Sequence, residues 1–456
     1  MGSTSQPLTI AILGGGIAGL ALAAGLTKKP HLSVTAFESI LAHRDVGAGL
    51  ALHLNAIKAM ALIGPEVRQA YLDKATSIAS EADQEIATEV ILAQGPHAGQ
   101  LVAELGRAKG RKSVSRADLL DGLLALLPEG TVRYGKKVDK IWTTQNGGKD
   151  EDEFKVCVGF GENKGFFEAD CVLAADGIHS VARGHLLGED HPATKPKNHD
   201  RWQVYRTLVS AEEARGQINE RWLTTVPILL GPCGHVNVIP LNKGTRISAG
   251  VAVRGVADSK EAAGGPDDVT YHDSNDGDKK QGLDPGLYAD YSEDAQRIVR
   301  MVAKDTSASW SVGDHDHAPF YAKGRVAMLG DAAHASLPFA GNGAAQALED
   351  AAVLDHLFSR VKRVEDIEAA LRAYDATRRP RSQAVVDLAR QFGRVYAYAT
   401  EDKMHEDPER MRKFFGGWAA FTNNADLGKQ NDDAMRAYEQ FLASGIGSGV
   451  ESRDFV

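Results

Sequence analysis

The hydrophobic pattern at the start of the chain predicts a strand, a helix and a second strand. Residues Leu8–Leu13 form a continuous apolar run, as expected of a strand that is buried on both faces. In the segment Ile17–Thr27, apolar and small residues recur at the three- and four-residue spacing of a helix. A second apolar run follows at Leu32–Phe37. Together these segments predict a βαβ unit with two parallel strands.

Further along the chain, extended and helical patterns alternate. Ser115 begins a capping sequence ahead of the apolar helix expected at Leu119–Leu127. Strands are then predicted in four regions, namely 131–142, 153–160, 169–175 and Tyr205–Val253. Residues 255–286 are poor in large apolar side chains, which predicts a long surface loop or insertion. From residue 344 onward the pattern is mostly helical. One apolar stripe of that region is made of Leu354, Leu357, Phe358 and Val361.

Composition and charge exclude several classes of protein. The 456 residues are enough for two or three domains, and 43% hydrophobic residues are ordinary for a globular protein. The net charge of −9 argues against a general binder of nucleic acid or of anionic membranes. The three cysteines form neither a CxxC nor a zinc-binding pattern, which fits a reducing compartment without structural disulfides. Because no apolar run approaches the roughly 20 residues of a membrane span, and no targeting signal is evident, we expect a cytoplasmic protein.

The turn between the first strand and the first helix has the pattern GxGxxG, at Gly14, Gly16 and Gly19. Glycines at these places allow a tight turn, close backbone approach to a pyrophosphate, and close packing of helix on strand. The helix N-terminus offers free N–H groups and a partial positive charge to the phosphates. Glu38 ends the second strand, where a carboxylate binds ribose hydroxyls and disfavours a 2′-phosphate. A glycine-rich turn without a ligand is the alternative, but the surrounding elements favour bound NAD or FAD.

Two more strands are followed by an acid beside a glycine. Val172–Ala175 leads into Asp176-Gly177, and Val326–Leu329 leads into Gly330-Asp331. Small residues and the start of a helix then follow in the stretch GDAAHASLPFAGNGAAQALED, residues 330–350. With GxGxxG before them, these motifs make the chain resemble the single-component (class A) FAD-dependent aromatic monooxygenases, the salicylate-hydroxylase-like group. The resemblance runs from about residue 8 to residue 395.

The resemblance implies an α/β fold with a Rossmann-like FAD-binding domain of the glutathione-reductase type. A β-sheet substrate domain would be inserted into it, and helices would follow at the C-terminus. The FAD-binding domain would be discontinuous, covering 1–184 and 286–395, with the substrate sheet at 185–285 and a helical segment at 396–456. These last helices could cap the pocket, form a dimer face or pack as ordinary core, and the protein would be a monomer or a homodimer.

The resemblance also assigns contacts to FAD. Glu38 would bind the adenosine ribose, and Arg116 would approach the pyrophosphate and the ribityl chain. Asp331 would bond a ribityl hydroxyl, whereas Asp176 is linked in the family to both FAD and NAD(P)H. Ala48 and Gly49 would belong to a loop along the flavin.

The redox ring would lie against the segment that opens the late helix. Pro338 would sit beside the isoalloxazine, with Gly341, Asn342, Gly343 and Ala344 under its pyrimidine edge. The positive end of that helix would then face the anionic reduced ring. We attribute Glu349 and Asp350 to the favourable placement of acids near a helix start, and His334 to local structure.

Candidate substrate contacts lie mainly in the strand-rich region. Arg206 stands where relatives carry an arginine that faces the active site, and it could clamp a carboxylate or phenolate. A salt-bridged sheet arginine is an equal alternative. His235, Asn237 and Ile239 alternate and would share one face of a regular strand, so Asn237 is a further candidate. Ile239 replaces a phenol-binding tyrosine of some dearomatising relatives.

His53 follows the flavin loop in the sequence. It could serve as a base or a substrate contact, and a structural histidine is the alternative.

The implied reaction is hydroxylation of a phenol or hydroxybenzoate. NADH or NADPH would reduce FAD, the reduced FAD would take up O2 as a C4a-hydroperoxide, and one oxygen would pass to an electron-rich ring carbon. The expected ligands are therefore FAD, NAD(P)H, O2 and a small aromatic substrate. Alternatives are a dearomatising hydroxylase or epoxidase of secondary metabolism, a flavin oxidase on the same fold, and an FAD-binding protein without turnover.

Overall fold

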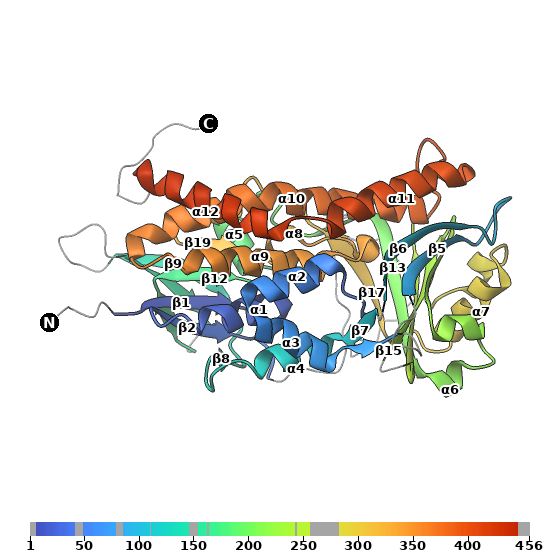
Figure 1. The fold of residues 1–456 in the computed structure, drawn as a ribbon, viewed down its shortest axis with the longest axis horizontal. Coiled ribbons are helices and arrows are strands. Elements are labelled where there is room, and N and C mark those ends of the chain that lie inside the picture. The colour runs from blue at the N-terminus through green and yellow to red at the C-terminus, as the bar shows by residue number, and fades with distance from the viewer. Residues whose placement is uncertain are drawn as a thin grey trace.

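The protein was analysed as a computed structural model, which describes residues 6–41, 49–78, 85–109, 111–145, 154–161, 164–241, 244–255 and 282–445. Two large sheets lie at opposite ends of the long axis (Figure 1). Long C-terminal helices run along one side of both sheets and connect the two ends of the molecule.

The first sheet is mainly parallel and carries the predicted βαβ unit. Its strands, in spatial order, are β18 (Ala322–Lys323), β19 (Val326–Met328), β12 (Cys171–Ala174), β1 (Leu8–Leu13), β2 (Leu32–Phe37) and β8 (Val132–Arg133). Strands β19, β12, β1 and β2 run parallel, with Leu13 beside Ala174 and Ala174 beside Met328. The carboxyl ends of three strands therefore meet at one edge of the sheet. The segment that follows each of them carries one of the three sequence motifs.

Helices and a small sheet cover the first sheet. Helix α1 (Ile17–Leu26) packs against α9 (Gly343–Phe358) and α4 (Arg116–Leu124). An antiparallel sheet of β9 (Lys140–Gln145), β10 (Phe154–Gly159) and β11 (Phe166–Ala169) shares the same hydrophobic core. Near α1 and α4 lie α2 (Leu54–Ile63) and α3 (Pro65–Lys74). A short sheet of β3 (Gly49–Leu50), β7 (Lys112–Ser115) and β4 (Thr76–Ser77) connects this half to the second.

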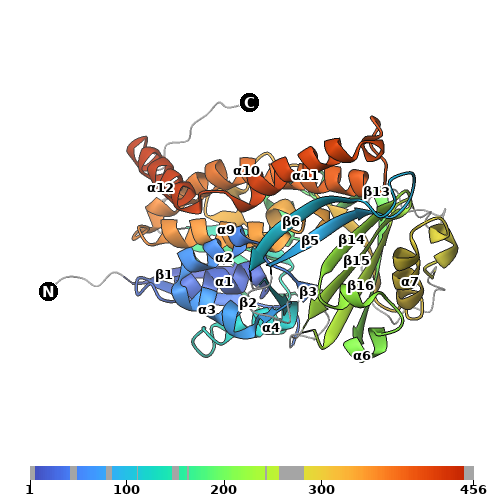
Figure 2. The ribbon, with the colours of Figure 1, turned by 45° about the vertical axis from the view of Figure 1, so that its right-hand side comes forward.

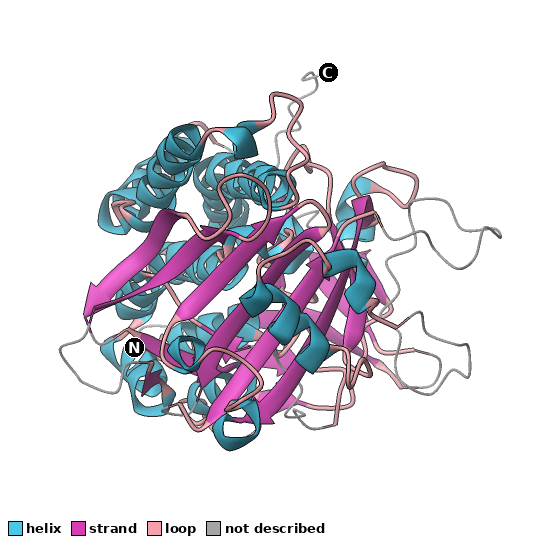
Figure 3. Ribbon diagram, turned by 90° about the vertical axis from the view of Figure 1, so that its right-hand side faces the viewer, coloured by secondary structure: helices cyan, strands magenta, loops and turns pink. Residues whose placement is uncertain are grey.

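The second sheet is larger and almost entirely antiparallel. Its order is β17 (Ser309–Asp314), β13 (Lys197–Ser210), β16 (Arg246–Val253), β15 (Gly234–Leu241), β14 (Val226–Gly231), β5 (Glu85–Leu92) and β6 (Leu101–Lys109). Helix α7 (Glu293–Val302) covers its outer face, and α6 (Ala211–Ala214) lies at its border (Figure 2). Figure 3 shows this sheet with helices in front of it and helices behind it.

The C-terminal part of the chain is helical, as predicted. After α5 (Val181–Leu187) and the short α8 (Asp331–His334), α9 is followed by α10 (Ile367–Tyr396), α11 (Pro408–Asn423) and α12 (Leu427–Ala443). The four residues of the predicted apolar stripe are all fully buried. Helix α11 packs on β6 of the second sheet, and α12 packs on α9 and α10. Among the described helices, none combines the length and the apolar character that a membrane crossing requires.

The predicted fold class is confirmed, with some local corrections. The single strand predicted at 131–142 is wrong, because β8 and β9 are separate strands in different sheets. The strand predicted at 169–175 begins only at Cys171, since Ala169 still belongs to β11. Asp170 lies between β11 and β12, and its carboxylate accepts a hydrogen bond from the Thr9 amide. Helix α4 ends at Leu124 rather than at Leu127.

The substrate sheet extends beyond the range predicted for its domain. Strands β5, β6 and β17 come from outside 185–285, so those limits enclose only part of the sheet. The domain limits as such stay a prediction. Residues 256–281, most of the predicted loop or insertion, lie outside the described residues.

Candidate active site

Residues of all three sequence motifs line one cavity at the carboxyl edge of the first sheet. This cavity has a volume of about 490 Å³. The predicted cofactor residues that line it are Gly14, Gly16, Glu38, Arg116, Asp176, Asp331, Gly343 and Ala344. They come from four separate parts of the chain, and the parallel pairing of β1, β12 and β19 brings the three motif segments together.

The glycine turn is built to leave space on its open side. Gly14 has a φ of +97°, and a Cβ atom there would lie 2.2 Å from the Ala175 carbonyl oxygen. A Cβ atom on Gly19 would lie 2.0 Å from the Gly14 carbonyl oxygen, so the helix could not pack on the turn. Around Gly16 the nearest atom to such a Cβ is Arg116 Nη2, at 3.9 Å. The turn therefore needs two glycines for its own packing and presents the third to the cavity, which fits a bound pyrophosphate.

Of the three acids that line this cavity, Glu38 and Asp176 already have partners in the protein. Glu38 Oε2 accepts a hydrogen bond from the Gly15 amide at 2.6 Å, which holds the carboxylate beside the glycine turn. Asp176 Oδ2 accepts from the amides of Val181, at 2.8 Å, and Ala182, at 3.2 Å. Asp176 thus supports the first turn of α5, while burial raises the pKa of its carboxyl group. The roles in FAD and NAD(P)H binding that the resemblance gives these acids stay predictions.

A second cavity, of about 370 Å³, continues from the first toward the large sheet. The two cavities share Leu50, Asp331, Gly343 and Ala344 in their walls. The other predicted cofactor and substrate residues that line the second cavity are Gly49, His53, Arg206, Asn237, Pro338, Gly341 and Asn342. Gly19 lies behind the glycine turn and outside both linings, and Ala48 lies outside the described residues.

Asp331 stands at the junction of the two cavities. It is the first residue of α8, and its side chain is exposed toward the cavity. The surrounding protein raises the pKa of this carboxyl group by desolvation, against the opposing charges of His334 and Arg116. No described residue donates a hydrogen bond to the Asp331 carboxylate, so it is available to a ligand.

Two guanidinium groups that line the second cavity have no carboxylate partner among the described residues. Arg206 Nη1 donates to Ser248 Oγ at 3.1 Å, while its buried Nε has no partner. Arg111 donates to the Leu105 carbonyl at 3.3 Å. Burial lowers the pKa of each group to about 10, so both remain cations at neutral pH. Neither group forms an ion pair with any described residue. Within the described part of the chain, Arg206 is therefore not the salt-bridged sheet arginine of the alternative interpretation.

Within the described ranges, two other polar groups along this cavity also lack hydrogen-bond partners. The predicted face of β15 is confirmed, because His235, Asn237 and Ile239 all line the cavity. The buried His235 Nδ1 and the Tyr396 hydroxyl make no hydrogen bond with the described part of the chain. Burial and the nearby Arg206 lower the pKa of His235 to about 3. Burial and Arg111 likewise lower that of His53 to about 4, so both rings are neutral at pH 7.

Sequence reasoning missed Arg111 and Tyr396. Arg111 precedes β7, and Tyr396 ends the 30-residue helix α10. Neither residue belongs to a motif, and no periodicity in the sequence marks either of them as facing a cavity. The packing of β7 and α10 against β15 of the second sheet places them there.

The explanation predicted for Glu349 and Asp350 is wrong. These acids lie in the middle of α9, fully buried, and not in its first turn. Arg378 Nη1 donates to Glu349 Oε2, and Arg378 Nε donates to Asp350 Oδ1, both at 2.8 Å. His334 Nε2 lies 2.5 Å from Asp350 Oδ2, which is consistent with the structural role expected for His334. Buried ion pairing, rather than the helix dipole, accounts for the two acids.

Comparisons with known proteins agree with this geometry. A protein family described as "FAD binding domain" matches residues 123–389, more than half of the chain. The 6-methylsalicylate 1-monooxygenase atA of Aspergillus terreus is 33% identical over 446 residues, which cover 96% of this chain and 94% of the relative. A salicylate hydroxylase of Pseudomonas putida is 32% identical, with 85% of this chain and 86% of the relative covered.

Solved structures point to the same family. A salicylate hydroxylase solved as a substrate complex superposes with a TM-score of 0.76 at 30% identity, over 94% of this chain and 98% of the other. The cradle of glycine backbone and the cavity beyond it fit FAD, which is the cofactor of this family. The chain belongs to the class A FAD-dependent monooxygenases, in the group that resembles salicylate hydroxylase.

Proposed function

We propose that this enzyme hydroxylates a monocyclic aromatic carboxylic acid that also carries a ring hydroxyl, as salicylate does. The observation that carries this proposal is the pair of cavity-facing cations, Arg206 and Arg111, which lack a carboxylate partner among the described residues. A buried cation without a counter-ion is unfavourable, so an anionic ligand that reaches it is strongly preferred. The names of two relatives, a 6-methylsalicylate monooxygenase and a salicylate hydroxylase, support the same substrate class.

The rest of the cavity suits a small ring. Its apolar wall includes Val226, Ile228, Ile239 and Val251 from the second sheet. These side chains can hold a benzene ring and a small apolar substituent while the guanidinium groups bind the carboxylate. Bound FAD, reduced by NADH or NADPH, supplies the oxygen-transfer chemistry. The protein orients the ring and excludes water from the reacting atoms.

We also propose roles for the cofactor-side residues. Gly14 and Gly16, with the first turn of α1, hold the pyrophosphate, and Glu38 binds the adenosine ribose. Arg116 approaches the phosphates and ribityl chain, while Asp331 bonds a ribityl hydroxyl. Pro338, Gly341, Gly343 and Ala344 lie along the redox ring. His53 and Asn237 contact the substrate, His53 as a neutral ring.

A panel of four ring compounds tests the proposed substrate class. We expect salicylate and 6-methylsalicylate to stimulate NAD(P)H oxidation and to yield hydroxylated product. Benzoate should bind but give little product, because its ring lacks the activating hydroxyl. Phenol should show a much higher KM, because it lacks the carboxylate. The assay follows NAD(P)H oxidation, O2 uptake, product and released CO2 in parallel.

The panel also separates the alternatives. If phenol were used as well as salicylate, the proposed role of the cations would be wrong. O2 uptake with substrate but without NAD(P)H would identify an oxidase instead. The same measurements with NADH and NADPH would establish which nicotinamide the enzyme prefers.

Replacing Tyr396 with phenylalanine should weaken substrate binding without weakening the fold. The Tyr396 hydroxyl is buried at the cavity and has no partner in the described part of the chain, so its removal costs no internal hydrogen bond. A hydrogen bond lost to a bound substrate would raise KM by about 3- to 10-fold. Tyr398→Phe is the matched control, because the Tyr398 hydroxyl donates to the carbonyls of Gln94 and Leu230.

The two tyrosine variants should therefore behave in opposite ways. Tyr398→Phe should lower the melting temperature and leave KM unchanged. Tyr396→Phe should raise KM and leave the melting temperature unchanged. A Tyr396→Phe enzyme with an unchanged KM for every active substrate would show that its hydroxyl does not contact the ligand. Steady-state kinetics and thermal melts of both holoenzymes provide the comparison.

A further inference from the structure

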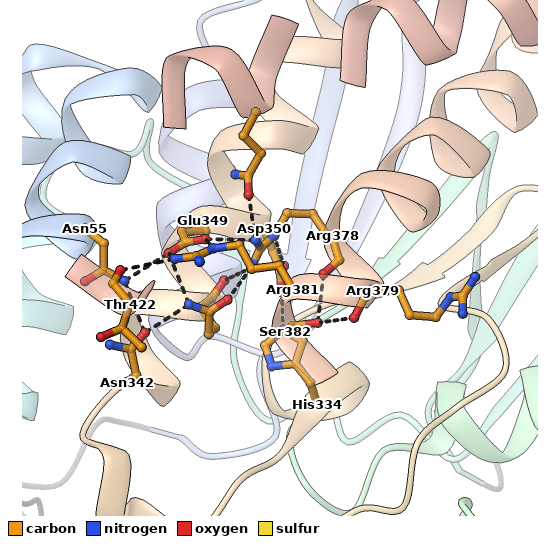
Figure 4. Close-up of polar contacts among 12 residues, drawn as sticks. Asn55, His334, Asn342, Glu349, Asp350, Arg378, Arg379, Arg381, Ser382 and Thr422 are labelled. Atoms are coloured by element: carbon orange, nitrogen blue, oxygen red, sulfur yellow. Dashed lines mark hydrogen bonds and ion pairs between the residues drawn. The ribbon is translucent and has the colours of Figure 1, made fainter. Parts of the chain in front are cut away.

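A network of charged side chains, most of them fully buried, joins α9 to α10 (Figure 4). Arg378 of α10 bonds both Glu349 and Asp350 of α9, each at 2.8 Å. Arg381 is a second cation in this network, and its Nε donates to Glu349 Oε2 at 2.7 Å. Two carboxylates are thus matched by two guanidinium groups, without counting His334.

The network is joined to both backbone segments that line the redox end of the cavity. Asp350 Oδ2 accepts from the amide of Gly330 at 2.9 Å, one residue before Asp331. Glu349 Oε1 accepts from the side-chain amides of Asn55, at 2.9 Å, and Gln346, at 3.1 Å.

The same two amides also donate to Asn342 Oδ1, at 3.1 and 2.9 Å. Asn342 lines the second cavity and immediately precedes Gly343, the first residue of α9. Hydrogen bonds therefore connect this network directly to residues beside the cofactor site.

The network also controls the charge on the helix that faces this site. The side chain of the N-cap residue Asn342 forms no capping hydrogen bond with the described part of α9, so the free N–H groups present the positive end of the helix dipole to the cavity. Glu349 and Asp350 lie on the same helix, and their negative charges would oppose that dipole. Arg378 and Arg381 cancel those charges. In the protein interior such effects are weakly screened, so one uncompensated charge would be felt at the helix start.

Stability is a poor reason for so many buried charges. Well-packed apolar residues are usually as stabilising as a buried ion network of the same volume, or more so. A function in the cofactor site explains the network better, because reduced flavin carries a negative charge that oxidised flavin lacks. The electrostatic potential at the start of α9 therefore distinguishes the two redox states.

We propose that Arg378 and Asp350 are positioning residues that act through α9 to set the reduction potential of bound FAD. Arg378 keeps the helix start positive and so favours the reduced cofactor, while Asp350 limits that preference. The inference concerns FAD alone and is independent of the substrate proposed above.

The test measures the reduction potential of FAD in the holoenzyme without substrate. In Arg378→Met, one buried carboxylate is left uncompensated, and we expect the preference for reduced over oxidised FAD to fall about tenfold. For a two-electron couple, that change is a shift of about 30 mV to more negative potential. In Asp350→Asn, one guanidinium is left in excess, and the shift should be of similar size but positive. The double variant Arg378→Met/Asp350→Asn should return close to the wild-type potential.

Two further variants keep the test decisive. Arg372→Met is the matched control, because Arg372 lies on the same helix and pairs with Glu368 at the exposed surface. The reduction potential of FAD in this variant should equal that of the wild type. If Arg378→Met does not fold, the partly exposed Arg381→Met removes the other cation from Glu349 and should also shift the potential negatively.

A purely structural role of Arg378 and Asp350 would not shift the reduction potential of FAD in opposite directions in the two variants. Shifts of the same sign in Arg378→Met and Asp350→Asn, or no shift in variants that retain full FAD occupancy, would overturn the proposal. Thermal melts of the apoproteins would report the structural cost separately from the potential.

Discussion

Replacing Asp331 with alanine is expected to yield a folded protein that has lost most of its FAD. The Asp331 carboxylate lies at the junction of the two cavities and accepts no hydrogen bond from the described residues, so the fold does not depend on it. Its pKa is raised by desolvation, which means that the apoprotein bears a cost for keeping it ionised. A hydrogen bond from a ribityl hydroxyl to this charged group would contribute about 1.5–3 kcal/mol, or a 10- to 100-fold change in Kd for FAD.

The measurements are the ratio of flavin to protein absorbance and a fluorescence titration of apoprotein with FAD. Asp170→Asn is a matched control. Asp170 is a buried carboxylate that accepts hydrogen bonds from the Thr9 amide, at 2.8 Å, and from Lys155 Nζ, at 2.5 Å. It precedes the amino end of β12, whereas the cofactor cavity lies at the carboxyl end, so its loss should lower the melting temperature without changing the affinity for FAD. An Asp331→Ala protein with full flavin occupancy would contradict the role proposed for this carboxylate.

Replacing Arg206 with methionine is expected to lower kcat/KM for a hydroxybenzoate by about 100-fold, or roughly 3 kcal/mol. The substrate carboxylate would lose a desolvated cation, and methionine is long enough to fill much of the space. The apoprotein should become no less stable. With the described residues Arg206 makes one side-chain hydrogen bond, to Ser248, and its pKa is already depressed by burial. FAD occupancy should be unchanged.

Two comparisons make this prediction specific. For phenol, which has no carboxylate, the same variant should lose little or no kcat/KM. Arg221→Met is the control variant, because Arg221 lies at the same end of the molecule and pairs with Glu89 on an exposed surface. Equal losses for phenol and salicylate would show that Arg206 supports the cavity rather than binding the carboxylate.

The parts of the fold that were predicted correctly depend on local chemistry. The apolar run of β1, the glycine turn and the helical spacing of α1 are neighbours in the sequence, and each favours the same local structure. The strand limits of β1 and β2 were therefore predicted to the residue. The error at 131–142 has the same origin, because a local pattern cannot show that Val132 and Lys140 enter different sheets.

Contacts between distant parts of the chain were beyond such reasoning. Strands β5 and β6 join the second sheet through the parallel pairing of β5 with β14, more than a hundred residues later. Glu349 and Asp350 were attributed to a helix dipole because Arg378 lies two to three dozen residues further on, in another helix. Neither partner could be identified without knowing how the elements pack.

The difference between the features that were predicted from the sequence and those that the folded structure alone revealed follows from how far apart in the chain the interacting groups lie. Turn geometry, hydrophobic periodicity and the spacing of three motifs are properties of short segments, and they were enough to indicate the fold and the dinucleotide cradle. Whether Arg206 is paired, whether Arg111 and Tyr396 reach the cavity, and which cations neutralise the acids of α9 depend on atoms that folding brings together from afar. Burial and pairing are relations between such atoms, so the chemistry of the substrate pocket emerged only when the two sheets and the long C-terminal helices were in place.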